Sequence, residues 1–256
     1  RLSHLWQGEL DTEESLRTLE VSGYSECESL LVHIHALRQG PVYRSLSTAA
    51  RGRLDRLMPV QLHETSRADQ PATTMARLID FLTAISRRSV YLSLLLDNQA
   101  VRQQLIRFTS ASEWMANGLT RYPILLDELL TGYDDDSFSL AVLEKALRFR
   151  LGSVANDDLE EQMTQLREYR HARVMGVASL SIGNKLPAAD TGRALSNIAE
   201  TCARGATAIS THAITRNHGT PGGIDAENIP FCVIGYGKLG GRELGYGSDL
   251  DLVFLS

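Results

Sequence analysis

Cysteine is scarce in this sequence. Its three cysteines, Cys27, Cys202 and Cys232, lie far apart, and no two of them form a Cys-x-x-Cys pair. Disulfide frameworks and zinc sites need cysteines that recur at short, regular spacings. The cysteine pattern therefore argues against a disulfide-stapled secreted domain and against a zinc site, and a reducing cytoplasm is the compartment that fits it best.

Long hydrophobic runs are absent as well. A helix that crosses a bilayer needs about 18 or more consecutive apolar residues. The longest candidate, residues 90–96, is interrupted by Ser93 and ends at Asp97. The first residues contain neither a methionine nor the apolar segment of a signal peptide. We therefore expect no association with a membrane.

A strong excess of one charge is the third absence. The 256 residues carry a formal net charge of −5 at pH 7, with 43% hydrophobic and 22% charged residues. These values are ordinary for a soluble globular protein and provide no general attraction to nucleic acid. The length suffices for one large domain or two ordinary ones. Nucleic acid is therefore not an expected partner.

Most of the chain has the apolar periodicity of helices. Apolar residues recur at intervals of three and four in five segments: residues 28–39, 75–96, 141–151, 157–181 and 190–211. Helix-breaking residues separate such segments at four places: residues 40–41, 69–71, 132–136 and 185–187. The sequence therefore predicts that residues 1–211 are overwhelmingly helical.

The C-terminal part has a different composition. Residues 216–230 are rich in Gly, Pro and Asn, which predicts a surface loop. Residues 231–234 form a short apolar run of β-forming residues, and residues 250–255 predict a second strand after a glycine-rich turn. Because the sequence opens without a methionine and stops inside a predicted strand, we expect it to be truncated at both ends. The expected order is a helical region followed by the first strands of an α/β or α+β core.

Two aspartates, Asp249 and Asp251, open the second predicted strand. Alternate side chains share one face of a strand, so both carboxylates should point the same way while Leu250 and Leu252 point into the core. Carboxylates about 6.6 Å apart along a strand repel each other. A divalent cation between them would relieve this repulsion, and oxygen ligands suit magnesium. Taken alone, the pair is more typical of two solvated carboxylates on an exposed strand face. The glycine turn before it reverses this preference and favours the metal-binding interpretation.

Four glycines follow directly on the first predicted strand: Gly235, Gly237, Gly240 and Gly241. Glycines allow backbone N–H groups to approach phosphates closely. A Rossmann site would need a crossover helix of ten or more residues, whereas only residues 241–248 intervene before Asp249. A P-loop is excluded because Leu239, rather than Ser or Thr, follows Lys238. There remain a strand, a phosphate-binding glycine turn and a strand that opens with Ser-Asp-x-Asp.

The full string is Gly-x-Gly-Lys-Leu-Gly-Gly-x-Glu-Leu-x-x-x-Ser-Asp-Leu-Asp-Leu, over residues 235–252. It resembles the glutamine synthetase adenylyltransferase/adenylyl-removing family, a branch of the DNA polymerase β-type nucleotidyltransferases. Residues 108–254 are similar to that family throughout, and residues 1–96 more loosely. The sequence departs from the broader superfamily at Lys238, where a serine usually follows the glycine; lysine is the expected residue in the narrower family.

The resemblance implies a fold class and a domain organisation. The fold would be mainly α, a helical bundle leading into the first strands of an α/β, polymerase β-like nucleotidyltransferase core. Residues 1–96 would form a helical linker or regulatory region, residues 97–229 the helical subdomain of a nucleotidyltransferase module, and residues 230–256 the start of its catalytic core. Such enzymes carry two modules, and the chain resembles the second, adenylylating one.

The resemblance also implies roles for single residues. Asp249 and Asp251 would be the catalytic carboxylates and would bind magnesium (Mg²⁺). ATP, the substrate, would be held by six residues: Gly235, Gly237, Lys238, Gly240, Gly241 and Ser248. A third carboxylate would lie beyond Ser256, so the 256-residue chain alone should be inactive. The sequence leaves the roles of Arg242 and Glu243 open.

The implied reaction is adenylyl transfer from ATP to a tyrosine of glutamine synthetase, which regulates nitrogen assimilation. The whole multifunctional enzyme would also remove AMP by phosphorolysis. Glutamine synthetase is thus the implied protein substrate, and the PII signalling protein and glutamine are the implied regulators. Two alternatives stay open at this point: a related protein nucleotidyltransferase with another acceptor, and a non-catalytic helical regulatory module.

Overall fold

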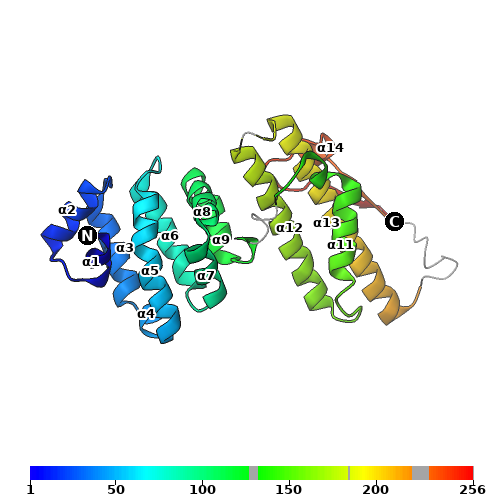
Figure 1. Cartoon of the computed structure of the whole chain (residues 1–256). Helices are drawn as coiled ribbons and strands as arrows, with labels where there is room; N and C mark the ends of the chain where they lie inside the picture. Colours follow the sequence, from blue (N-terminus) through cyan, green and yellow to red (C-terminus); the bar gives the residue numbers. More distant parts are fainter. Residues whose placement is uncertain (127–131, 184, 221–230, 256) are drawn as a thin grey trace. The chain divides into compact units, whose positions relative to one another are not determined.

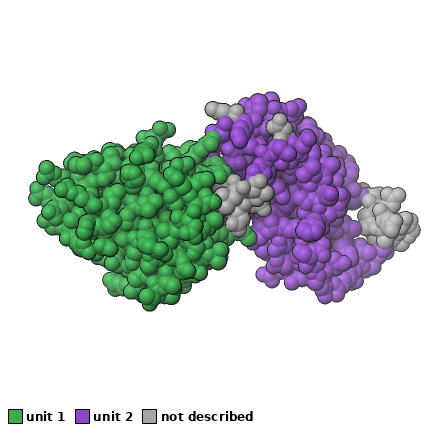
Figure 2. Space-filling model, viewed as in Figure 1, with its two compact units in different colours: residues 1–130 green, residues 131–256 purple. Residues whose placement is uncertain are grey.

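Helices make up most of the chain in a computed structural model, which describes residues 1–126, 132–183, 185–220 and 231–255. The chain divides into two compact units, Arg1–Leu130 and Thr131–Ser256, which are shown in green and purple in Figure 2. Within the described residues no strand precedes Cys232. The predicted helical character of residues 1–211 is therefore confirmed. Within those same ranges, no helix is long and apolar enough to cross a membrane.

The first unit consists of helices that follow one another along the chain (Figure 1). They are α1 (Leu2–Gln7), α2 (Thr12–Val21), α3 (Cys27–Gln39), α4 (Pro41–Arg44), α5 (Thr48–Thr65), α6 (Pro71–Ile85), α7 (Ser89–Asp97), α8 (Gln99–Ala111) and α9 (Glu113–Arg121). Helix α6 packs against α3 and α9, and α5 packs against α1 and α7. Side chains cap several helix starts; for example, Asp11 accepts the backbone N–H of Glu14 at 2.8 Å. The predicted breaks at residues 40–41 and 69–71 are confirmed.

The prediction of one continuous helix over residues 75–96 is wrong. Helix α6 ends at Ile85 and α7 begins at Ser89, after Arg88 adopts a non-helical conformation with φ −103° and ψ 86°. The hydroxyl of the fully buried Ser86 donates to the carbonyl of Thr83, so the turn satisfies its own polar groups. The apolar positions keep helical spacing across the break, and periodicity therefore could not reveal it. The break allows α7 to pack on α5 while α6 packs on α3.

A buried ion pair joins three helices of this unit. The Arg102 guanidinium donates to both carboxylate oxygens of Glu64, at 2.9 and 2.8 Å, and to the carbonyls of Leu95 and Leu96 at the end of α7, at 2.7 and 3.0 Å. The side chains of Arg102 and Glu64 are only 10% and 15% exposed. While both partners are present, their attraction offsets most of the free energy needed to remove the two charges from water. If one partner is removed, the buried charge that remains strongly destabilises the fold.

Arg102→Met is therefore expected to lower the free energy of unfolding by about 3 kcal/mol, because it strands the Glu64 carboxylate and two helix-terminal carbonyls. Chemical denaturation of the 256-residue chain, followed by circular dichroism, measures this. Arg17→Gln, on an exposed face of α2, is the control and should change the free energy by less than about 0.5 kcal/mol. Equal effects of the two substitutions would contradict the prediction.

The second unit is built on two long helices, α12 (Leu159–Ile182) and α13 (Ala188–His218), which pack against each other and against α11 (Leu140–Leu151). A 3₁₀ turn, η1 (Asp135–Phe138), precedes α11. The buried core of the unit includes Leu143, Leu147, Tyr169, Val177 and Ile198. Helix α13 is longer at both ends than the predicted 190–211.

Residues 216–218 belong to α13, so the predicted loop over residues 216–230 begins too early. The helix ends at Gly219, whose φ of 78° lies in the left-handed region that favours glycine. Polar residues such as Arg216 and Asn217 are compatible with an exposed helix end, which is why composition alone misplaced the boundary. The rest of the predicted loop, residues 221–230, lies outside the described residues.

The sheet comprises β1 (Cys232–Gly235) and β2 (Leu252–Leu255), with the short helix α14 (Gly237–Gly240) following β1. The strands are antiparallel, and Gly235 pairs with Leu252 while Cys232 pairs with Leu255. The Tyr236 N–H donates to the carbonyl of Asp251 at 2.8 Å and extends the ladder toward the glycine turn. The predicted succession of strand, glycine turn and strand is confirmed.

The prediction that Leu250 points into the core is wrong. Its side chain is 42% exposed, and Leu252 is only partly buried. β2 begins at Leu252 rather than at residue 250, so Leu250 precedes the regular pleat that would have fixed its direction. Within the described residues β2 pairs with β1 only, and large apolar side chains such as Val253 and Phe254 are also exposed.

Candidate functional site

The glycine turn folds back on the end of β1. Gly237 has a φ of 55°, in the left-handed region, and begins α14. The N–H groups of Gly240 and Gly241 donate to the carbonyls of Tyr236 and Gly237, at 3.1 and 2.9 Å. A Cβ atom at Gly240 would lie 2.8 Å from the carbonyl oxygen of Gly235. Glycine at these positions therefore allows the turn to pack tightly against the strand end.

Gly237 and Asp251 are in contact across this turn. A Cβ atom at position 237 would overlap Oδ2 of Asp251. The missing side chain leaves space for the carboxylate, and the backbone bond between Tyr236 and Asp251 keeps the two segments together. The structure thus brings a predicted metal-ligating carboxylate next to the glycine turn predicted to bind phosphates.

The other predicted site residues lie around this contact. Asp249, Asp251 and Lys238 are exposed, and Asp249 stands two residues before Asp251 in the segment that enters β2. Among the described residues, Lys238 forms no ion pair with a carboxylate, and no group of three or more His, Cys, Asp or Glu side chains could hold a metal. Both aspartates precede β2, which begins at Leu252, so the prediction that they lie on one face of a strand is wrong. That the two carboxylates share a magnesium ion stays a prediction.

Ser248 shapes the turn before the aspartates. Its Oγ accepts the N–H of Gly245 at 2.9 Å, and its own N–H donates to the carbonyl of Gly245 at 3.1 Å. Nearby, Leu244 is buried in the core of the second unit, and the Tyr246 hydroxyl donates to Ser181 Oγ of α12 at 2.9 Å. Burial raises the pKa of the Tyr246 phenol, so the hydroxyl keeps its proton. These contacts anchor the segment between the glycine turn and Asp249.

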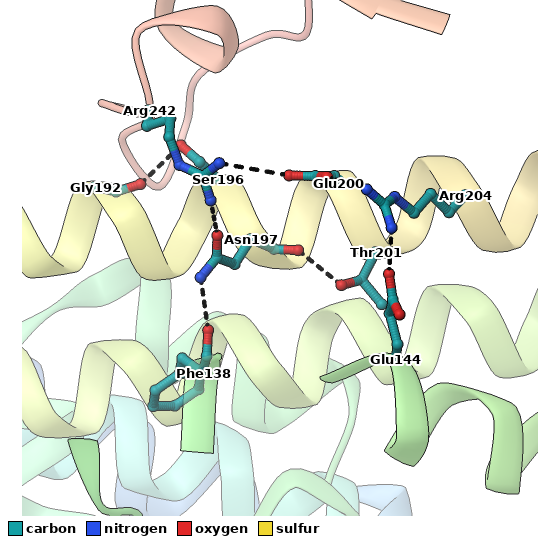
Figure 3. A network of polar contacts seen from close by, with 9 residues as sticks. All are labelled: Phe138, Glu144, Gly192, Ser196, Asn197, Glu200, Thr201, Arg204 and Arg242. Carbon is teal, nitrogen blue, oxygen red and sulfur yellow. Dashed lines mark hydrogen bonds and ion pairs between the residues drawn. The ribbon is translucent and has the colours of Figure 1, made fainter. Parts of the chain in front are cut away.

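Arg242 ties the glycine turn to α13 (Figure 3). Its guanidinium donates to Oδ1 of Asn197 and lies 3.8 Å from Oε2 of Glu200. Asn197 in turn donates from Nδ2 to the carbonyl of Phe138 at 2.9 Å, and Glu200 pairs with Arg204 at 2.6 Å. The sequence left the role of Arg242 open; in the structure its side chain anchors the turn to α13.

Asn197 and Glu200 were not identified from the sequence. Arg242 and Asn197 are 45 residues apart, and no local pattern indicates that they meet. Gly192 completes the contact, because a Cβ atom there would lie 3.1 Å from Cα of Glu243. Gly192, in the predicted helix over residues 190–211, was the one sequence signal for this contact. A glycine within a helix indicates a close approach only once the fold shows which segment approaches it.

The backbone at Arg242 has a φ of 57°, an unfavourable value for a residue with a side chain. Arg242→Gly and Arg242→Ala both remove the guanidinium, but only glycine adopts this conformation without strain. The glycine variant is therefore expected to be more stable than the alanine variant by about 1 kcal/mol, as measured by urea denaturation. Equal stability would show that the turn relaxes to a negative φ once the anchor is lost.

A cleft of about 550 Å³ lies between the sheet and α13. Eleven residues line it: Glu200, Ala203, Arg204, Thr207, Ala208, Phe231, Val233, Gly235, Leu239, Gly240 and Leu252. Only Gly235 and Gly240 of the predicted site residues belong to this lining. The cleft therefore lies beside the Gly237–Asp251 contact and does not contain the two aspartates.

The sequence is similar to a known protein family and to individual members of it. The sequence profile of the family described as glutamate-ammonia ligase adenylyltransferase matches residues 102–256. A bifunctional glutamine synthetase adenylyltransferase/adenylyl-removing enzyme of Nitrosococcus oceani is 40% identical over 266 residues, covering 100% of this chain and 27% of that protein. Relatives of the same name from Thioalkalivibrio sulfidiphilus and Idiomarina loihiensis are 38% and 36% identical, over 99% and 100% of the chain.

The fold and the turn define a mainly helical chain in which a strand and a glycine turn are followed by two aspartates and a second strand. The chain belongs to the glutamate-ammonia ligase adenylyltransferase family. This confirms the resemblance seen in residues 235–252. The chain spans about a quarter of the length of these curated relatives, 27% of each of the three.

Proposed function

We propose that the complete protein containing this chain transfers an adenylyl group from ATP to a tyrosine of glutamine synthetase, and that it also removes AMP by phosphorolysis. The names of the relatives describe those proteins as bifunctional enzymes of this kind. Within the chain, the observation that carries the proposal is the contact between Gly237 and Oδ2 of Asp251. This contact brings a carboxylate suited to a metal ion beside a glycine turn suited to phosphate groups, two of the elements that the proposed reaction uses.

The domain organisation is part of this proposal. Residues 1–96 are a helical linker or regulatory region, residues 97–229 the helical subdomain of the adenylylating module, and residues 230–256 the start of a polymerase β-like nucleotidyltransferase core. The antiparallel β1–β2 pair and the glycine turn between them support the last assignment. The PII signalling protein and glutamine act as regulators, and the enzyme works in the cytoplasm.

The residues present suit magnesium and a triphosphate. Asp249 and Asp251 offer exposed carboxylate oxygens, the ligand type that Mg²⁺ prefers. When bound, Mg²⁺ supplies positive charge that stabilises the reacting phosphate oxygens. The glycine turn can approach the triphosphate closely because four of its residues carry no side chain: Gly235, Gly237, Gly240 and Gly241.

Two side chains add specific contacts in this proposal. Lys238 has no carboxylate partner among the described residues, so its ammonium is available to the phosphates. The Ser248 Oγ accepts the N–H of Gly245, which leaves its hydroxyl proton free to be donated to a phosphate oxygen. Arg242 holds the turn in place through Asn197 and Glu200 and does not itself need to reach the nucleotide.

The proposal is tested with the complete enzyme, ATP labelled at the α-phosphate, and purified glutamine synthetase. We expect label on a tyrosine of glutamine synthetase in the presence of Mg²⁺, and none after the metal is removed with a chelator, because the carboxylates then have no cation to hold against the triphosphate. An unrelated protein rich in exposed tyrosines is the control acceptor. Label on the control but not on glutamine synthetase would favour another acceptor, and no label on either would favour a non-catalytic module.

A further inference from the structure

A cluster of arginines lies in the first unit, in residues that precede the matched family profile at residue 102. A cleft of about 540 Å³ is lined by five residues of α3, α4 and α5: Arg38, Gln39, Tyr43, Arg44 and Arg51. Three of the five are arginines. Among the described residues, none of these three forms an ion pair with a carboxylate within 4.0 Å. The cleft therefore gathers positive charge that the surrounding protein does not pair.

Two of the arginines are fixed against one aromatic ring. The guanidinium carbon of Arg38 lies 4.3 Å from the ring centroid of Tyr43, and that of Arg51 lies 5.3 Å from the same centroid. The Tyr43 side chain is buried, with 4% exposure, and its hydroxyl donates to Oδ1 of Asp55 at 2.8 Å. Trp6 Nε1 donates to the same oxygen at 2.8 Å. The Asp55 carboxylate thus accepts hydrogen bonds from two neutral donors and fixes the Tyr43 ring through its hydroxyl.

The arginines keep hydrogen-bond donors that the protein does not use. Nη2 of Arg51 donates to the carbonyls of Arg44 and Leu46, at 3.1 and 3.5 Å, which fixes the guanidinium. Its Nε is buried and has no hydrogen-bond partner. Arg38 donates only from Nε, to the carbonyl of Trp6 at 3.3 Å, among its hydrogen bonds in the described residues. A buried donor without a partner is unfavourable, so an incoming acceptor at this place would be stabilised.

We propose that this cleft binds a phosphate group through Arg38, Arg44 and Arg51. Planar guanidinium groups match the oxygens of a phosphate and donate paired hydrogen bonds to it. Three positive charges gathered in one cleft favour an anion with more than one negative charge over a monovalent one. Stacking on Tyr43 holds two guanidinium groups in place before the anion arrives, which reduces the entropy cost of binding.

Trp6 provides a direct readout of binding. Its indole donates to Asp55, and its ring centroid lies 5.7 Å from the guanidinium carbon of Arg38, which lines the cleft. The chain has two tryptophans, so Trp114→Phe in the 256-residue chain leaves Trp6 as the single fluorophore. Inorganic phosphate is titrated into this protein, and chloride keeps the ionic strength constant. A parallel titration replaces phosphate with acetate, a monovalent anion. We expect a saturable change in Trp6 fluorescence with phosphate and a much weaker response to acetate.

Matched substitutions locate the site. Arg44→Gln and Arg51→Gln should each weaken phosphate binding at least about tenfold, since each removes a charged donor. Arg56→Gln is the control, because Arg56 also lies on α5 but donates from Nε to the carbonyl of Gly52 outside the cleft; its affinity should match the parent protein. Circular dichroism checks the fold, and the exposed Arg44 keeps the test valid if Arg51→Gln fails to fold. No saturable response to phosphate, an equal response to acetate, or an equal loss in Arg56→Gln would overturn the proposal.

Discussion

Asp251→Asn in the complete enzyme is expected to lower the rate of adenylyl transfer about a thousandfold. The proposed site holds Mg²⁺ on Asp249 and Asp251, and asparagine removes the negative charge while it keeps the shape of the side chain. A metal contributes several kcal/mol of transition-state stabilisation in such reactions, and about 4 kcal/mol corresponds to a factor of a thousand in rate. Initial rates with saturating ATP and glutamine synthetase measure the effect.

The fold should survive this change. The Asp251 carbonyl, not its side chain, accepts the Tyr236 N–H, and the carboxylate is exposed. The free energy of unfolding is therefore expected to change by less than about 0.5 kcal/mol. Asp190→Asn is the matched control, because Asp190 pairs with Arg193 on α13 and is not one of the proposed metal-binding or nucleotide-binding residues. Full transfer activity in Asp251→Asn would point to a vestigial nucleotide site and contradict the proposed function.

Gly237→Ala should have the second largest effect, a loss of about a hundredfold in adenylyl transfer. Alanine disfavours the φ of 55° at this position by about 1–2 kcal/mol. Its Cβ would also overlap Oδ2 of Asp251, so either the turn or the carboxylate must move. A shift of about 1 Å in a reacting group can cost a factor of a hundred in rate. The substitution thus tests whether the Gly237–Asp251 contact positions the site.

Gly247→Ala provides a control in the same segment. A Cβ atom at Gly247 meets no heavy atom within 4 Å, and the glycine does not have a positive φ. This variant should keep the activity and the stability of the parent enzyme. KM for ATP and kcat are measured for both variants in parallel. If both glycines tolerate alanine equally, the contact with Asp251 does not matter for transfer.

Much of the local structure was predictable from the sequence. The helical segments at residues 28–39, 141–151 and 157–181 correspond closely to α3, α11 and α12, because burial of one helix face leaves a period of three and four in the chain. The spacing of the glycines and of Asp249 and Asp251 likewise predicted a strand, a turn and a strand. The same string identified the family, since its letters are specific without reference to neighbours in space.

Helix boundaries were less predictable. The break between α6 and α7 at residues 86–88 leaves the apolar period intact, and only the packing of α7 against α5 gives a reason for it. The exposure of Leu250 follows from where β2 begins to pair with β1, which alternation along the chain cannot determine. In these places tertiary packing overrides a local preference.

The sequence by itself determined the helical character of the chain, the glycine turn with its aspartates, and the family. The tertiary structure alone decided that Gly237 contacts Asp251, that Arg242 is held by Asn197 and Glu200, and that three arginines of the first unit meet around Tyr43. The physical reason is the separation along the sequence of the residues that interact. Periodicity and turn composition report on residues a few positions apart, whereas these contacts join residues that become neighbours only when the helices and strands pack.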